Sequence, residues 1–124
     1  MTTLGAEMIS VQPGSVEIRC GFNAKFTQQN GFVHAGVITS ILDSACGYAA
    51  LSVAPAESEV LSVEFKVNFL APAVGEAFVA RAVVKRAGKT LTICSADAYA
   101  VNGGREKLIA TMLATIMNIA EKAS

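Results

Sequence analysis

Residues 34–53 read HAGVITSILDSACGYAALSV, and this stretch decides the fold. Its apolar side chains recur at helical spacing in an alanine-rich segment, which predicts a helix from Ala35 to about Val53, ending before Pro55. Few charges surround it, and a helix that is apolar on nearly every side is a buried helix. Its polar members share one stripe, because they follow each other at helical intervals: Ser40, Asp43, Ser44 and Gly47.

Alternating patterns before and after this helix predict strands. One lies over residues 15–22. After Pro55, one face carries Val63, Phe65, Val67 and Phe69, and the other carries Ser62, Glu64, Lys66 and Asn68. Further strands are predicted over residues 76–86 and 90–100, with a turn at 71–75 and hairpin connections at 87–88 and 102–104. Residues 107–119 suit a helix by composition and, equally, a strand buried on both faces after a tight hairpin.

The predicted layout is a single α+β domain over residues 1–124, with strands, one buried helix, and then four hairpin-linked strands. An antiparallel sheet curled around one central helix buries both sets of apolar faces.

Composition restricts the classes of function. Ten basic and ten acidic residues give a formal net charge of zero, so neither nucleic-acid binding nor a polybasic membrane patch is expected. Hydrophobic residues make up 52% of the chain and charged residues 16%, which indicates that a subunit interface covers some apolar surface. Three widely spaced cysteines favour reduced thiols in the cytoplasm over a disulfide framework.

Targeting segments and metal sites are also not expected. The first ten residues lack the basic region and long apolar stretch of a signal peptide. No run is expected to reach the roughly 18–20 apolar residues that a membrane span needs. His34 is the only histidine, which excludes an H-E-x-x-H zinc site, and the cysteine spacings do not suit a structural zinc site.

Asp43 is the most informative residue. Burying a carboxylate on an otherwise apolar helix costs several kcal/mol of folding free energy unless the carboxylate is hydrogen-bonded or in contact with water. One interpretation is an acid satisfied by the neighbouring hydroxyls of Ser40 and Ser44, or by a subunit contact. The other is a catalytic acid that acts as nucleophile or as the base that activates water.

The start of the helix favours the catalytic interpretation. Backbone N–H groups at a helix N-terminus can stabilise a developing oxyanion, and Gly36 lets a ligand approach the backbone closely. Asp43 follows Ala35 by eight residues, which places them about 12 Å apart along the axis. One substrate carbonyl cannot contact both, so a site that uses both needs two antiparallel helices across a dimer interface.

One string in the chain carries a family signature. It reads NGFVHAG over residues 30–36 and continues with Leu42-Asp43 and alanine-rich sequence. It is similar to the H-G-G…D signature of hot-dog-fold acyl-CoA thioesterases, closest to the phenylacetate-degradation (PaaI-like) branch. The likeness runs over about residues 14–119 and includes SVEF at 62–65 and RAGKT at 86–90. It implies the hot-dog fold, an antiparallel sheet wrapped around one long central helix, with residues 107–119 as a strand and two subunits pairing their sheets side by side.

The resemblance also implies roles for individual residues. In the family, two sites form at each dimer interface, so Ala35, beside Gly36, would supply the oxyanion N–H, and Asp43 of the partner subunit the nucleophile or general base. Ser62 matches a position that helps place the hydrolytic water or the acid, the alternative being an ordinary outward-facing serine. His34 matches the signature histidine, as an organiser of the loop in preference to a proton shuttle.

Two positions depart from the family pattern. Ala35 stands where relatives usually have the first glycine of H-G-G, which keeps the N–H but adds a Cβ near the carbonyl and disfavours positive φ. Gln28 stands where relatives often carry asparagine, and its longer amide would place the same hydrogen bond differently. Both changes are expected to bear on substrate choice or activity.

Coenzyme A is expected as part of the substrate, with no separate cofactor and no metal. Lys85, Arg86 and Lys89 resemble the basic loop that meets its phosphates in relatives, the alternative being a solvated hairpin tip. Arg105 and Lys107 on the next hairpin are weaker candidates.

The leading hypothesis is hydrolysis of an acyl-CoA thioester, with an aryl, arylacetyl or short- to medium-chain acyl group. A hydratase would need a histidine beside an acid, for which His34 is poorly placed. The alternative of a different class is a non-catalytic acyl-CoA binding or sensing domain. For Phe32, Tyr48 and Leu51 a core or interface position is favoured over the wall of an acyl pocket. The predicted oligomer is a homodimer, with a tetramer of two dimers as the further option.

Overall fold

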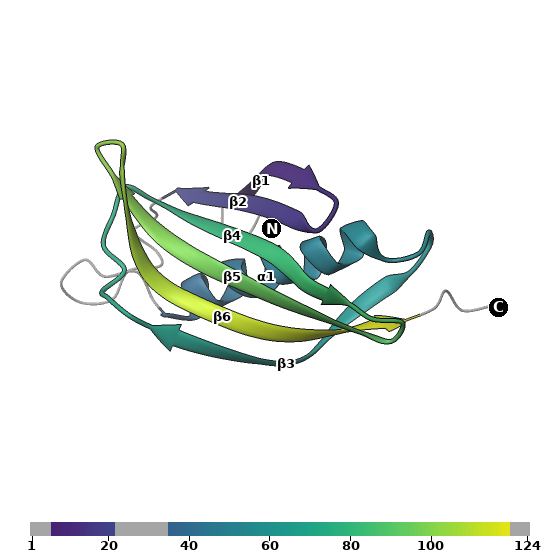
Figure 1. Ribbon diagram of the computed structural model, residues 1–124. Coiled ribbons are helices and arrows are strands. Elements are labelled where there is room, and N and C mark those ends of the chain that lie inside the picture. The colour runs from purple at the N-terminus through teal and green to yellow at the C-terminus, as the bar shows by residue number, and fades with distance from the viewer. Residues whose placement is uncertain (1–5, 22–34, 120–124) are drawn as a thin grey trace.

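The computed structural model describes residues 6–21 and 35–119. One helix, α1 (Ala35–Val53), lies on one face of a six-stranded antiparallel sheet (Figure 1). The strands are β1 (Ala6–Gln12), β2 (Ser15–Gly21), β3 (Glu59–Phe69), β4 (Ala77–Ala87), β5 (Leu91–Asn102) and β6 (Arg105–Ile119). The expected hot-dog architecture is therefore confirmed, including α1 at its predicted bounds and residues 107–119 as a strand.

The strand order across the sheet is β1-β2-β4-β5-β6-β3. Both predicted hairpins, β4–β5 and β5–β6, are present. The β5–β6 turn has positive φ at Gly103 and Gly104, which is the backbone that a two-residue type I′ turn requires.

The prediction that β3 and β4 form a hairpin is wrong. β3 pairs with β6 at one edge of the sheet, and β4 lies between β2 and β5. The connecting residues cross the ends of the intervening strands, where the Leu70 amide donates to the Ile109 carbonyl and the Glu76 amide to the Val101 carbonyl. A segment with one proline, two alanines and a glycine suits a crossover as well as a turn, so local composition could not separate the two.

Strand β1 was not predicted. It pairs with β2 across the Pro13-Gly14 turn, where Gly14 has a φ of 79°. The Pro-Gly dipeptide was the available signal. The Gly14 amide donates to Ser52 Oγ near the end of α1, which ties this hairpin to the helix.

The core lies between α1 and the concave face of the sheet. The helix packs against all six strands. Small side chains on the inner face of the sheet allow this close approach: Ala80, Ala82, Ala96, Ala98, Ala100, Ala110 and Ala114 are all buried. Larger buried side chains such as Phe78 and Ile109 fill the remaining space.

By length and composition, α1 could cross a membrane, since its 19 residues include an apolar window of mean hydropathy 1.3. The expectation that no stretch reaches such a length is therefore wrong. The core explains the apolar character, because eight residues of this helix are buried against the sheet.

Candidate functional site

Asp43 and Ser62 form the polar centre of the candidate site. Ser62 Oγ donates a 2.7 Å hydrogen bond to Asp43 Oδ1, joining the middle of α1 to β3. Both side chains are partly buried. A hydrogen bond to a carboxylate is among the stronger polar contacts, so it holds the acid in one orientation. The contact brings together two of the residues that the family resemblance singles out, the helix acid and Ser62.

A β-bulge places Ser62 on this face. Directly opposed residues on neighbouring strands point to the same side of a sheet. Ser62 opposes Ile116 and Phe65 opposes Ala114, and both partners are buried under the helix. Ser62 and Phe65 are three residues apart, and they share a face only because the register shifts between Ser62 and Glu64.

The sequence-based assignment of Ser62 to the polar face of β3 is therefore wrong. The alternation predicted for β3 continues through Val63, but Val63 is the extra residue of the bulge, so the inward and outward positions are exchanged on its two sides. Phe65, Val67 and Phe69 do lie on one face, as predicted, because they all follow the bulge.

A pocket with a volume of about 220 Å³ opens beside the Asp43–Ser62 pair. Its lining is mostly apolar away from the pair, and comprises Asp43, Ser44, Gly47, Tyr48, Leu51, Val60 and Ser62. Tyr48 and Leu51 are 40% and 39% exposed, so of the core or interface position expected for them the core alternative does not hold within this chain. They form a wall of the pocket that the Asp43 carboxylate faces.

The helix start lies at the other end of the same rigid element. α1 begins at Ala35, whose backbone N–H has no acceptor within the helix because no earlier turn exists. The helix runs without interruption to Val53, so Ala35 and Asp43 are separated by about 12 Å along its axis. The two groups therefore cannot contact one carbonyl within one chain. His34, Gln28 and Phe32 lie outside the described residues.

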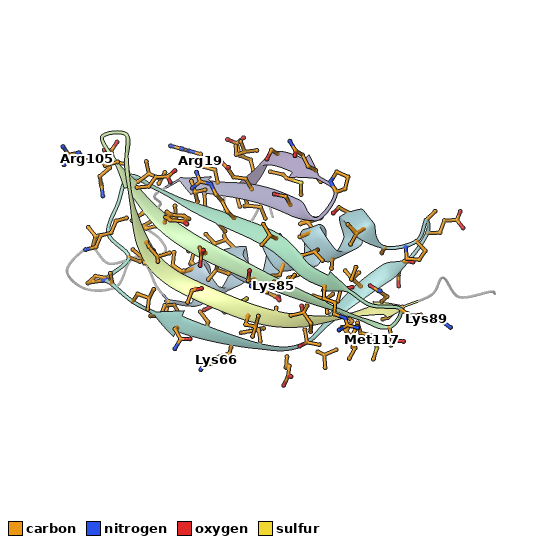
Figure 2. The ribbon with its side chains drawn as sticks, viewed as in Figure 1. Arg19, Lys66, Lys85, Lys89, Arg105 and Met117 are labelled. Atoms are coloured by element: carbon orange, nitrogen blue, oxygen red, sulfur yellow. The ribbon has the colours of Figure 1, made fainter. Side chains whose placement is uncertain are left out.

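The three predicted phosphate-binding cations do not form one cluster. All are exposed, but Lys85 lines a depression on the outer face of the sheet with Lys66, Ser95 and Thr111. Lys89 lies at the β4–β5 hairpin, and Figure 2 shows it beside Met117 at the end of the sheet opposite to Arg105. Arg86 opposes Ile93 near that hairpin.

The β4–β5 hairpin has a defined backbone. The Gly88 amide donates to the Leu91 carbonyl at 2.9 Å, and a Cβ at Gly88 would lie 2.4 Å from that oxygen. The Asn118 side-chain amide donates to the carbonyls of Gly88 and Lys89 at 3.2 and 3.4 Å. Asn118 opposes Val60 of β3, so β6 connects the hairpin to the pocket wall.

Within the described ranges, no three His, Cys, Asp or Glu side chains form a group that could hold a metal ion. The described residues of this site supply an oriented carboxylate beside an apolar pocket.

Comparisons with known proteins agree with this arrangement. The sequence model of the family described as the thioesterase superfamily matches residues 30–107. A solved thioesterase family protein from Silicibacter pomeroyi is 52% identical, with a TM-score of 0.95, covering 97% of this chain and 88% of that chain. The PaaI protein of the E. coli phenylacetic acid degradation operon has a TM-score of 0.86 over 98% of this chain and 84% of that chain, and at 22% identity it shows the fold alone.

A curated relative, a candidate esterase of Saccharolobus solfataricus, is 32% identical over 73% of this chain. The chain spans 64% of the length of that relative.

Proposed function

This chain belongs to the thioesterase superfamily, and from that membership we propose that it hydrolyses an acyl-CoA thioester to a carboxylic acid and coenzyme A. The observation that carries the proposal is the Asp43 carboxylate, held by Ser62 at the mouth of an apolar pocket. The pocket takes the acyl group, and the carboxylate lies where the thioester carbonyl would enter.

Two routes use this carboxylate. As general base, Asp43 removes a proton from a water whose oxygen bonds to the acyl carbon. As nucleophile, its own oxygen bonds to that carbon, and water then hydrolyses the resulting anhydride. In both routes the carbon–sulfur bond breaks and the sulfur takes up a proton to leave as the CoA thiol. Ser62 keeps the carboxylate oriented in either case.

The oxyanion would be stabilised by the N–H of Ala35 at the start of α1 of the partner subunit. The 12 Å separation along one helix supports this composite site, because a second antiparallel helix brings the missing N–H to Asp43. Gly36, His34 and Gln28 would complete the surroundings of that N–H. Lys89 at the β4–β5 hairpin, with Arg86 near it, would meet the CoA phosphates.

The exposed apolar residues of β3 support a homodimer. β3 lies at an edge of the described sheet and exposes Leu61, Val63, Phe65 and Phe69. An edge strand with such side chains is a template for pairing with another chain. We place the subunit interface there.

The test is thiol release from a panel of aryl and fatty acyl-CoAs by wild-type protein and Asp43→Asn. We expect turnover by the wild type and a loss of about a hundredfold or more in the variant, with an unchanged melting temperature. Asp97→Asn is the matched control, because Asp97 accepts a 2.7 Å hydrogen bond from Thr111 on the outer face of the sheet. Equal rates for Asp43→Asn and wild type would refute the mechanism. Binding without any turnover by the wild type would instead identify a sensing domain.

The composite site has its own test. Ala35→Pro removes the proposed oxyanion N–H at a helix position that tolerates proline. We expect Ala35→Pro and Asp43→Asn each to be inactive. Co-refolded in equal amounts, they should recover about a quarter of the wild-type rate, since half of the dimers are mixed and each mixed dimer holds one intact site. A mixture that stays inactive would contradict a site shared between two subunits.

A further inference from the structure

Within the described part of this chain, nothing requires residue 47 to be glycine. It lies within α1, and its φ is not among the positive values, which among the described glycines occur at Gly14, Gly103 and Gly104. Apart from its chain neighbours and the nearby backbone of the helix itself, a Cβ built on Gly47 would meet no described atom within 4 Å. By contrast, a Cβ on Gly88 would collide with a backbone oxygen at 2.4 Å. Neither backbone conformation nor packing therefore excludes a side chain at Gly47.

The glycine carries a cost in stability. Glycine inside a helix is less favourable than alanine, because it loses more backbone freedom on folding. The same helix uses alanine at three neighbouring positions, Ala45, Ala49 and Ala50, which are fully buried. The space at Gly47 is thus kept open although alanine at this position would make the helix more stable.

That volume belongs to the pocket. Gly47 follows Asp43 by one helical turn on the same side of the helix and lines the pocket together with Ser62, Tyr48 and Leu51. One turn corresponds to about 5.4 Å, so a side chain at Gly47 would lie beside the first carbons of an acyl group whose carbonyl is at Asp43. Tyr48 and Leu51 lie beyond it, toward the end of the helix.

We propose that Gly47 is a specificity-determining residue, whose missing side chain admits apolar acyl groups that are branched or carry a ring within the first carbons after the carbonyl. This rests on the proposed thioester hydrolysis at Asp43. A slender straight chain can pass a methyl group at this position, whereas bulk next to the carbonyl cannot. The space therefore distinguishes acyl groups by width near the carbonyl and not by length.

The experiment compares wild type, Gly47→Ala and Gly47→Val on straight-chain acyl-CoAs (butyryl, hexanoyl, octanoyl) and wide ones (2-methylbutyryl, benzoyl, phenylacetyl). We expect Gly47→Ala to melt at a higher temperature and to lose at least tenfold in kcat/KM on wide substrates, with less than about twofold change on straight ones. Gly47→Val should lose still more kcat/KM on wide substrates relative to straight ones. Gly21→Ala is the matched control, because Gly21 also has open space but lies outside the pocket lining; its kcat/KM ratio should equal that of the wild type.

If Gly47→Ala has the same ratio of kcat/KM on wide substrates to kcat/KM on straight ones as the wild type, the inference is overturned. A lower melting temperature of Gly47→Ala would also overturn it, because the fold would then need this glycine. Failure of the proposed function has a different signature, namely no turnover by the wild type on any acyl-CoA. The inference is then decided by calorimetric affinities for the same panel, where Gly47→Ala should weaken the binding of wide acyl-CoAs at least tenfold and leave straight ones unchanged.

Discussion

Ser62 Oγ lies 2.7 Å from Asp43 Oδ1, and this hydrogen bond connects two elements that are adjacent in the chain but belong to opposite sides of the core. The acid is supplied by the helix and its orientation by the edge strand β3. Any movement of β3 relative to α1 therefore changes the direction in which the carboxylate points, which makes the proposed activity sensitive to the packing of that edge.

Ser62→Ala should lower kcat about tenfold to a hundredfold with little change in KM, because a hydrogen bond to a charged group is worth about 1.5–3 kcal/mol. Ser62→Thr keeps the hydroxyl and should restore most of kcat. Steady-state kinetics on one acyl-CoA and thermal melts provide the measurement. Thr111→Val removes the equivalent hydroxyl-to-Asp97 contact on the outer face and should leave kcat unchanged. A Ser62→Ala enzyme with full kcat would show that Ser62 does not position the acid.

Lys89→Gln should raise KM for acyl-CoA roughly threefold to tenfold and leave kcat unchanged, because Lys89 would pair with a substrate phosphate remote from the reacting carbon. The difference between variant and wild type should shrink as NaCl rises, since an exposed ion pair is screened by salt. KM measured at several salt concentrations provides the test. Arg19→Gln, on β2 and far from Lys89 (Figure 2), is the charge-matched control, because the exposed Arg19 has no proposed role in binding. A salt-independent KM difference would contradict a phosphate contact.

The stability of the folded chain should fall above pH 9, partly because of Cys46. Burial, then the neighbouring Cys94 and the negative charge of Asp43, raise the pKa of the Cys46 thiol from 9.0 to about 12. Between these values the unfolded chain releases the proton and the folded chain keeps it, so the free energy of unfolding decreases with pH by at most about 1.4 kcal/mol per unit. Below pH 9 both states hold the proton, and no change is expected from this group.

Urea unfolding at pH 8, 9 and 10 on wild type and Cys46→Ala provides the measurement. The variant should show a smaller decline, with a remainder from Cys94, whose pKa burial raises to about 11. Parallel declines in the two proteins would exclude Cys46 as a contributor.

The helix and its acid could be predicted from the sequence because every local signal agrees there. Apolar periodicity, alanine content and the stop before Pro55 predict α1 at the bounds that the structure has. The two hairpins were equally accessible, since Gly88 and the Gly103-Gly104 pair mark turns that few other residues can form.

The position of β3 could not be predicted in this way. Its partner, β6, begins 36 residues after β3 ends, and pairing over such a separation leaves no local pattern. The bulge at Val63 is likewise invisible to an alternation argument, because it is the break in the alternation. The pattern also could not place Tyr48 and Leu51 in the pocket lining, since apolar residues on a core helix fit a core, an interface and a pocket equally well.

The pairing of β3 has a consequence for the order of events during synthesis. In the described sheet β3 neighbours only β6, the last strand. At about 5–20 residues per second, roughly 3–10 s pass between the synthesis of Phe69 and that of Ile119. Throughout that interval the helix with Asp43 is already made, while the strand with Ser62 has no template to pair with. The nascent chain therefore carries an acid without its hydroxyl partner, and the two are joined only when the C-terminal strand leaves the ribosome.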